Sequence, residues 1–330
     1  MFSLKFQRLV LRNAENIIKY RNLCTTFVRQ QKDESELPSV IVEKDDYITM
    51  IGINREASRN SIDSATAQRI CDALRQFEND DESPVAVLYG VGGSFSAGYD
   101  LQEFEKEVES GSFNFLMQHE GGVGPTRRNL KKPVICGING FCVANGLELA
   151  LLCDLRVMEE SAVLGFFNRH LGVPISDGGT ARLARSIGFS RALDLITTGR
   201  RVGAPEALSI GLVNRQVATG TALGQAVHLA FSIAKFPQAA LRHDRNSVYA
   251  NVYGKGDFRR AIQNEVMGIS HNVLEEMKVG AKKFKKADSV VELKKGKTDK
   301  WCIKEKLIPE WEKAEISHEE AFVRTKQETQ

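Results

Sequence analysis

The stretch KKPVICGINGFCVANGLELALLCDLRV, residues 131–157, decides the fold of this chain. Its first part, PVICGING, is a short apolar run between Pro133 and Gly140, which is typical of a buried strand. A loop of small residues, NGFCVANG, comes next, and GLELALLCD then predicts a buried helix because it is apolar nearly all round. The stretch therefore predicts a buried strand that leads through a small-residue turn into a buried helix.

Upstream of this stretch the sequence predicts the same kinds of element. Residues 39–54, SVIVEKDDYITMIGIN, form two β-rich runs around a polar turn and predict a hairpin. Residues 61–80 carry apolar side chains at helical spacing, with Asp63 or Ser64 able to cap the helix. Residues 84–90, PVAVLYG, predict another buried strand. Two strands followed by a helix recur along the chain, although no sequence repeat accompanies them.

Composition indicates a globular protein and excludes several classes. The chain has 330 residues, of which 42% are hydrophobic and 26% charged, so it is too apolar for extended disorder. Its formal charge is only +3, and the basic residues are spread along the chain, so charge does not imply nucleic-acid binding. The six cysteines include no CxxC pair and no zinc-ligand spacing, so we expect no metal site.

The first thirty residues differ from the rest. They contain six basic residues and a single acid, Glu15, with apolar residues at roughly helical spacing. This pattern is typical of a mitochondrial import segment, and the alternative is a basic surface helix of the mature fold. We expect import into the mitochondrial matrix and cleavage between Asn22 and Leu37. No later window reaches about 18 uncharged apolar residues, so we expect no membrane span.

Two small-residue loops precede helices. Residues 96–98, Ser-Ala-Gly, follow one predicted buried strand, and residues 139–146 follow another. The first N–H groups of a helix lack intrahelical acceptors and favour negative charge, so each loop could hold an anion. Two such loops facing each other would make an oxyanion hole. Taken singly, each loop is better interpreted as an ordinary strand-to-helix turn, where Gly and Asn are common.

Four segments follow one another along the chain: SFSAGYDL at 94–101, the stretch at 131–157, LGVPISDGGTARLARSIG at 171–188 and ALDLITTGRRVGAPEALSIGLVNRQV at 192–217. In this order and at this spacing they resemble the enoyl-CoA hydratase/isomerase (crotonase) superfamily. Upstream, INREASRNSID is similar to the family's loop on the acyl-CoA side. The resemblance covers residues 38–290. It leaves residues 1–37 as transit peptide and linker, and residues 291–330 as a charged C-terminal extension.

The resemblance implies an α/β fold, a spiral of ββα units with a helical C-terminal region that packs trimers, often paired into hexamers. It implies an acyl-CoA thioester as the partner and no separate cofactor, since CoA arrives as part of the substrate. In the family, two backbone N–H groups hold the thioester oxygen while the α-carbon passes through an enolate-like state. By position these groups belong to Ala97 and Asn145. The residues expected to line the substrate are Arg55, Ala57, Gly98, Tyr99, Asp100 and Gly146.

Asn145 stands where the family usually has the second of three glycines. Because the backbone does the work there, its side chain need only stay out of the way. Asn tolerates the left-handed region better than most residues, so we expect the oxyanion hole to survive.

Glu148 matches the first catalytic glutamate of the family. A carboxylate in the first turn of an apolar helix is costly to bury without a task, and catalysis is one such task. The alternative is a structural charge that satisfies the helix dipole.

The second catalytic glutamate of hydratases and isomerases in this family falls on Asn168. An amide can hold a water molecule but cannot accept a proton at neutral pH. Asp177 could take over if its carboxylate reached the pocket, although related enzymes place an aspartate nearer Ser176. The alternative for Asp177 is a cap of the helix that follows it.

Three functions remain open from the sequence. The first is an enoyl-CoA hydratase or lyase of mitochondrial fatty-acid or branched-chain metabolism, with Glu148 as its acid–base. The second is a carboxyacyl-CoA decarboxylase, which needs the oxyanion hole and one proton donor, so that Asn168 is no obstacle. The third is a non-catalytic acyl-CoA-binding protein that kept the fold, since fold alone does not settle function.

Overall fold

The computed structural model describes residues 38–111, 118–254 and 257–288. The predicted transit peptide at 1–37 and the charged extension at 291–330 lie outside the described residues. The described residues up to Leu274 belong to one compact unit, and the described chain from Glu275 is helical through Asp288.

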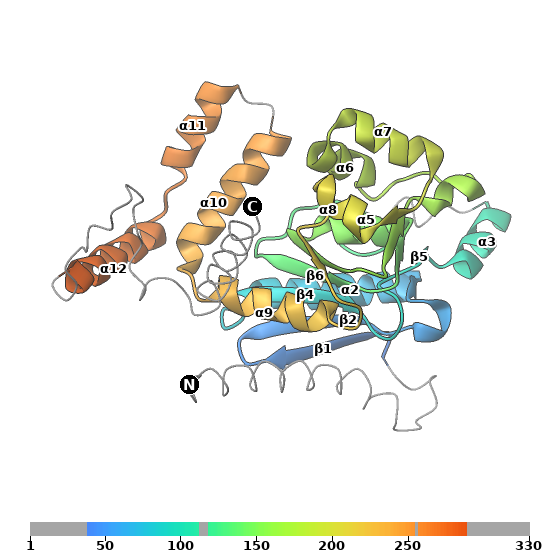
Figure 1. The fold of residues 1–330 in the computed structure, drawn as a ribbon, viewed down its shortest axis with the longest axis horizontal. Helices are drawn as coiled ribbons and strands as arrows, with labels where there is room; N and C mark the ends of the chain where they lie inside the picture. The colour runs from blue at the N-terminus through green and yellow to red at the C-terminus, as the bar shows by residue number, and fades with distance from the viewer. Residues whose placement is uncertain (1–37, 112–117, 255–256, 289–330) are drawn as a thin grey trace, which may run out of the picture. The chain divides into compact units, whose positions relative to one another are not determined.

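The main sheet has six strands in the order β1-β2-β4-β6-β8-β11 (Figure 1). The first two pair antiparallel as a hairpin, and every later neighbour pairs parallel. This confirms the hairpin and the buried strands expected from the sequence. The strands are β1 Val40–Asp45, β2 Ile48–Ile53, β4 Val85–Gly90, β6 Val134–Ile138, β8 Leu155–Glu159 and β11 Arg215–Val217.

Both faces of this sheet are covered. In β4 the side chains of Val85 and Val87 belong to the core under α9 (Ala222–Ala234), while those of Ala86 and Leu88 belong to the core shared with α2 (Ser64–Asn79). Alternate residues of a strand point to opposite faces. A strand buried on both faces reads as a continuous apolar run, which is what the sequence shows at β4.

Smaller sheets and short helices lie on the α2 side of the main sheet. The three-stranded sheet has the order β10-β9-β7, and β3 pairs parallel with β5. The predicted loop at 139–146 therefore contains a short strand, β7, before its helix begins. The strands are β3 Ser61–Ile62, β5 Gly98–Tyr99, β7 Phe141–Val143, β9 Val163–Gly165 and β10 Val202–Gly203.

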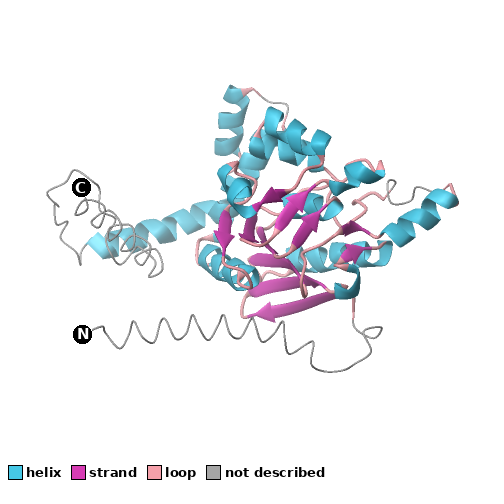
Figure 2. Cartoon of the chain, turned by 45° about the vertical axis from the view of Figure 1, so that its right-hand side comes forward, coloured by secondary structure: helices cyan, strands magenta, loops and turns pink. Residues whose placement is uncertain are grey.

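Helices make up most of the remaining described chain (Figure 2). Those near the small sheets are α3 Leu101–Glu109, α5 Asn145–Leu152, α6 Gly179–Ile187, α7 Phe189–Thr198 and α8 Ala204–Ser209, with two 3-10 turns, η2 Glu56–Ser58 and η3 Phe167–Leu171. The C-terminal helices are α10 Gln238–Tyr253, α11 Phe258–Met267 and α12 His271–Asp288. No helix in the described ranges is long and apolar enough to cross a membrane.

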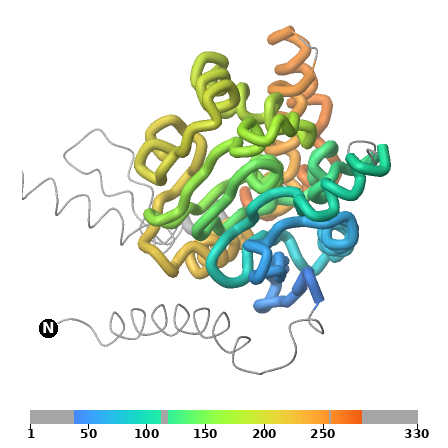
Figure 3. The backbone as a smooth tube through the Cα atoms, turned by 90° about the vertical axis from the view of Figure 1, so that its right-hand side faces the viewer, coloured from blue at the N-terminus to red at the C-terminus, as the bar shows by residue number. Residues whose placement is uncertain are grey.

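The helix α10 is tied to the sheet through Asp154, just before β8. Its carboxylate pairs with Arg245 at 2.7 Å and accepts the Tyr249 hydroxyl at 2.9 Å. The helical C-terminal region expected from the sequence is thereby confirmed, and its first helix is anchored to the sheet. Figure 3 follows the chain from the blue β1–β2 hairpin through the green central segments that carry the site.

Candidate active site

Glu148 lies in the first turn of α5, a helix whose eight residues are all buried. The helix follows β7 directly, and the connecting residue, Ala144, has φ 52° and ψ −129°. This confirms the strand, turn and buried helix predicted for residues 131–157. A fully buried carboxylate is unfavourable unless other groups satisfy it, so its partners decide what Glu148 can do.

Three N–H groups converge on the Glu148 carboxylate. Oε2 accepts the backbone N–H of Asp177 at 2.7 Å and that of Gly179 at 2.8 Å, while Oε1 accepts the side-chain amide of Asn145 at 3.0 Å. Position 179 must be glycine for this approach, because a Cβ there would lie 2.8 Å from Cγ of Glu148. The start of α6 is thus held against α5 through this one carboxylate.

Asp177 forms a second buried carboxylate beside the first. Its Oδ2 accepts the same Asn145 amide nitrogen at 3.1 Å, and its Oδ1 accepts Gly122 N–H at 3.0 Å and the Thr126 hydroxyl at 3.1 Å. Arg127 Nε lies 3.7 Å from Oδ1. The helix-cap interpretation of Asp177 is wrong, because Gly178 occupies the cap of α6 without a side-chain bond. Glu148 receives the N–H groups at that helix start instead.

Burial, first, and the negative charge of Asp177 together raise the pKa of Glu148 to about 7, against the opposing effect of the backbone N–H groups. An ordinary glutamate has a pKa near 4.5. A carboxyl that titrates near neutral pH can both take and give a proton under physiological conditions. The pair therefore has the electrostatics of an acid–base site.

Asn168 is not brought into this cluster. It lies on η3, is buried, and its Nδ2 donates to the Val173 carbonyl at 3.1 Å. Its Oδ1 has no hydrogen-bond partner among the described residues. The carboxylate next to Glu148 is accordingly Asp177, and Asn168 is held by its own loop.

The predicted oxyanion pair needs a correction at its first member. The N–H of Ala97 donates to the Arg59 carbonyl at 3.0 Å, so the fold itself uses that group. Directly after β5, the Asp100 N–H donates to the carbonyl of Ile62 in β3. Neighbouring N–H groups of a strand alternate in direction, so the Tyr99 N–H faces away from β3.

The second predicted member, Asn145, lies at a helix start. It is the first residue of α5, where a helix N–H has no intrahelical acceptor. A Cβ on Gly98 would lie 3.0 Å from Asn145 N, so β5 runs directly against this helix start. Ala144, not Asn145, has the positive φ, so the tolerance of Asn for left-handed backbone is not needed at position 145.

Arg55, Ala57 and Gly146 are the other predicted substrate residues, and the structure places each differently. Arg55 is engaged within the fold, pairing with Asp63 at 3.1 Å and Asp100 at 2.9 Å, so its guanidinium does not stand ready for a phosphate. Ala57 is exposed on η2, and Gly146 packs against Ser96. The sequence analysis assigned no role to the side chain of Asn145, which contacts both carboxylates. The signal for such a role was an amide at a position where the family usually has glycine.

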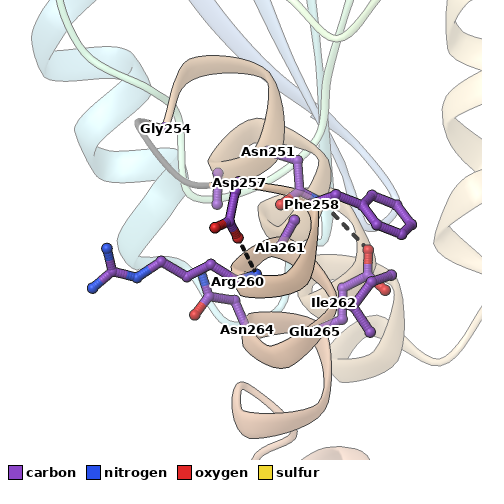
Figure 4. A pocket seen from close by; sticks show the side chains of 10 residues that line it. Asn251, Gly254, Asp257, Phe258, Arg260, Ala261, Ile262, Asn264 and Glu265 are labelled. Atoms are coloured by element: carbon purple, nitrogen blue, oxygen red, sulfur yellow. Dashed lines mark hydrogen bonds between the residues drawn. The ribbon is translucent and has the colours of Figure 1, made fainter.

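Two cavities lie elsewhere in the molecule. One of about 660 Å³ is lined by α10 and α11, where Asp257 accepts the N–H of Arg260 and Asn251 donates to Glu265 (Figure 4). Another of about 310 Å³ is lined by glycines that follow β4 and β6 and by Glu159. Neither is lined by Glu148 or Asp177. Within the described part of the chain, no group of three or more His, Cys, Asp or Glu side chains is arranged to hold a metal ion.

Known proteins share this architecture. The sequence model for the enoyl-CoA hydratase/isomerase family matches residues 43–291. A short-chain-enoyl-CoA hydratase of Clostridium acetobutylicum is 33% identical over 238 residues, which cover 71% of this chain and 89% of that protein. This chain therefore belongs to the enoyl-CoA hydratase/isomerase family.

Two further relatives extend the comparison. A bovine protein named enoyl-CoA hydratase domain-containing protein 2, mitochondrial, is 38% identical over 199 residues, which cover 59% of this chain and 66% of that protein. The crystal structure of an enoyl-CoA hydratase from Mycobacterium tuberculosis H37Rv superposes with a TM-score of 0.68 at 30% identity, covering 75% of this chain and 97% of that one. The crotonase fold expected from the sequence is confirmed.

Proposed function

We propose that this protein is an acyl-CoA-processing lyase of enoyl-CoA hydratase type, in which Glu148 exchanges a proton with a thioester substrate. The observation that carries the proposal is the fully buried Glu148, whose pKa burial and Asp177 raise to about 7, beside the start of α5. Membership of the enoyl-CoA hydratase/isomerase family supports the thioester as the substrate class.

The backbone at the start of α5 supplies the electrostatic part of the mechanism. The N–H of Asn145 and the N–H of Tyr99 on the adjacent β5 would hold the thioester oxygen while negative charge develops on it. One such donor contributes about 3 kcal/mol to lowering a barrier of this kind. The enolate form of the substrate is thereby stabilised without any charged side chain.

Glu148 supplies the proton transfer through one oxygen. Oε2 already accepts two backbone N–H groups, so Oε1 is left to exchange a proton. In hydration, Oε1 takes a proton from water, the hydroxide adds to the β-carbon, and the electron pair of the double bond moves to the thioester as the enolate. The α-carbon then takes the proton back from Oε1, so one carboxyl balances the reaction.

A carboxyacyl-CoA decarboxylase is the second candidate, and Asn168 is the observation that favours it. In that reaction the carbon–carbon bond to the carboxylate breaks, carbon dioxide leaves, and the electron pair forms the same enolate. Protonated Glu148 then delivers one proton to the α-carbon. No second carboxylate at position 168 is required.

Incubation with a panel of enoyl-, hydroxyacyl- and carboxyacyl-CoA thioesters, followed by mass spectrometry, tests the proposal. Hydration adds the mass of one water, and decarboxylation removes that of carbon dioxide. Binding without any mass change across the panel would contradict both and support the non-catalytic acyl-CoA-binding alternative.

Location and assembly are part of the proposal. The names of the bovine relative and of a Dictyostelium discoideum relative include "mitochondrial", which supports the matrix location inferred from residues 1–30. Exposed apolar side chains on α11, namely Phe258, Val266 and Met267, support a homotrimer or hexamer formed through the C-terminal helices. Light scattering of the purified protein tests this assembly, since a monodisperse monomer would contradict it.

A further inference from the structure

The side chain of Asn145 joins the two buried carboxylates of the site. Its Nδ2 carries two hydrogens and lies 3.0 Å from Glu148 Oε1 and 3.1 Å from Asp177 Oδ2. The amide nitrogen, and not its oxygen, faces both carboxylates. All three residues are buried, so these bonds are made away from water.

The two carboxylates differ in the charge of the groups that face them. Glu148 accepts the backbone N–H groups of Asp177 and Gly179 on Oε2 and the Asn145 amide on Oε1. Asp177 accepts the same Asn145 amide, Gly122 N–H and the Thr126 hydroxyl, and the positively charged Arg127 lies 3.7 Å from its Oδ1. A proton shared by the pair therefore resides on Glu148, away from the guanidinium, and Oε1 carries it because Oε2 is held by two backbone N–H groups.

We propose that Asn145 is a positioning residue that holds Glu148 and Asp177 as a one-proton pair and keeps Glu148 Oε1 as the proton-transferring atom. This inference rests on the proposed function, in which Glu148 moves the proton. It gives the Asn145 side chain a role beyond that of its backbone N–H, and it makes Asp177 a charge partner that does not itself touch the substrate.

Two substitutions should move the proton affinity of Glu148 in opposite directions. Asn145→Ala removes the donor to ionised Oε1 and leaves the two negative charges unscreened, so the pKa of Glu148 should rise. Asp177→Asn removes the neighbouring negative charge, so the pKa of Glu148 should fall. Damage to the fold would not separate the two variants by sign, and the double variant should return towards the wild-type value.

The experiment combines two readouts. One is the pH profile of kcat/KM with a thioester that the wild type converts. The other is a carbon-13 NMR titration of labelled glutamate carboxyls, with the Glu148 signal assigned by its loss in Glu148→Gln. Asn145→Ala should move the midpoints of the kcat/KM profile and of the NMR titration to higher pH, and Asp177→Asn should move them to lower pH. Each variant should shift the midpoints by about one pH unit, which is a tenfold change in proton affinity.

Shifts of the same sign in both variants, or none in either, would overturn the inference. If Asn145→Ala does not fold, Asn145→Ser keeps a single donor and should give a smaller upward shift. The NMR titration needs no turnover, so it tests the inference even if every thioester is inert and the proposed function fails. Turnover with an unmoved Glu148 pKa would overturn the inference and leave the function standing.

Discussion

Glu148 and Glu159 are two buried glutamates in similar surroundings. Glu148 accepts the N–H of Gly179, the first residue of α6, and Glu159 accepts the N–H of Ala222, the first residue of α9, at 3.3 Å. A helix start favours a negative charge, which explains why each is tolerated inside the protein. Burial raises the pKa of both.

Their difference lies in the second carboxylate. Glu148 has Asp177 beside it through Asn145, and the starts of α5 and α6 meet there. No second acidic group contributes to the raised pKa of Glu159, and Glu159 is the only acidic residue among the described residues that line its cavity. A helix start makes a buried glutamate possible, whereas a coupled partner makes it a site for proton transfer. Glu159 is therefore a matched control for Glu148.

The largest effect is expected from Glu148→Gln. Loss of the carboxyl removes the only proton carrier in the proposed mechanism, so turnover should fall about 100-fold or more while acyl-CoA affinity stays near wild type. Steady-state kinetics and isothermal titration calorimetry measure the two. The matched Glu159→Gln should stay within a few-fold of wild type, and equal losses in both variants would refute the assignment.

The variants Glu148→Gln and Glu159→Gln should also differ in how their free energies of unfolding depend on pH. The folded pKa of Glu148, about 7, lies above its usual 4.5, so the stability it contributes is present below about pH 4.5 and is lost as the pH rises through 7. Chemical denaturation should show that the free energy of unfolding of Glu148→Gln increases relative to that of wild type between about pH 5 and about pH 9, by up to about 3 kcal/mol. The gain for Glu159→Gln should have the same sign and be smaller. A wild type whose stability rises across that range relative to Glu148→Gln would count against the raised pKa.

Asn168→Glu tests whether a second acid at η3 improves hydration. The new carboxylate could hold the water or return the proton, so hydration of crotonyl-CoA should rise by about tenfold or more. A wild-type rate already at about 10 per second or faster would show that Asn168 is no handicap and would remove the reason for keeping the decarboxylase alternative. Asn168→Gln, which adds length without charge, is the control.

The smallest effect is expected at Ala144. Its φ of 52° and ψ of −129° are unfavourable for a residue with a Cβ. Ala144→Gly should therefore raise the free energy of unfolding by about 1 kcal/mol while leaving the Glu148 pKa unchanged. Thermal unfolding measures the first and the NMR titration the second, and destabilisation would show that this backbone is relaxed.

Much of the fold could be predicted because it depends on local pattern. Burial of β4 and of the strand and helix in residues 131–157 is predicted by their apolar sequence alone. Asp63 caps α2 as expected. The site depended on contacts between distant segments. That Asn145 would reach Asp177, 32 residues away, follows from how α5 meets α6, which no spacing reveals. The Ala97 assignment failed for the same reason, because its N–H is taken by Arg59 on a neighbouring segment.

Deuterium incorporation at the α-carbon tests the central claim most directly. Hydration and decarboxylation both pass through an enolate that Glu148 protonates, so product formed in D2O from crotonyl-CoA or from a carboxyacyl-CoA should carry one deuterium on that carbon. Mass spectrometry should show the deuterated product formed at similar rates by wild type and Glu159→Gln, and about 100-fold more slowly by Glu148→Gln. An equal rate of deuterated product formation with Glu148→Gln, or no deuterated product from any thioester of the panel with wild type, would contradict the account.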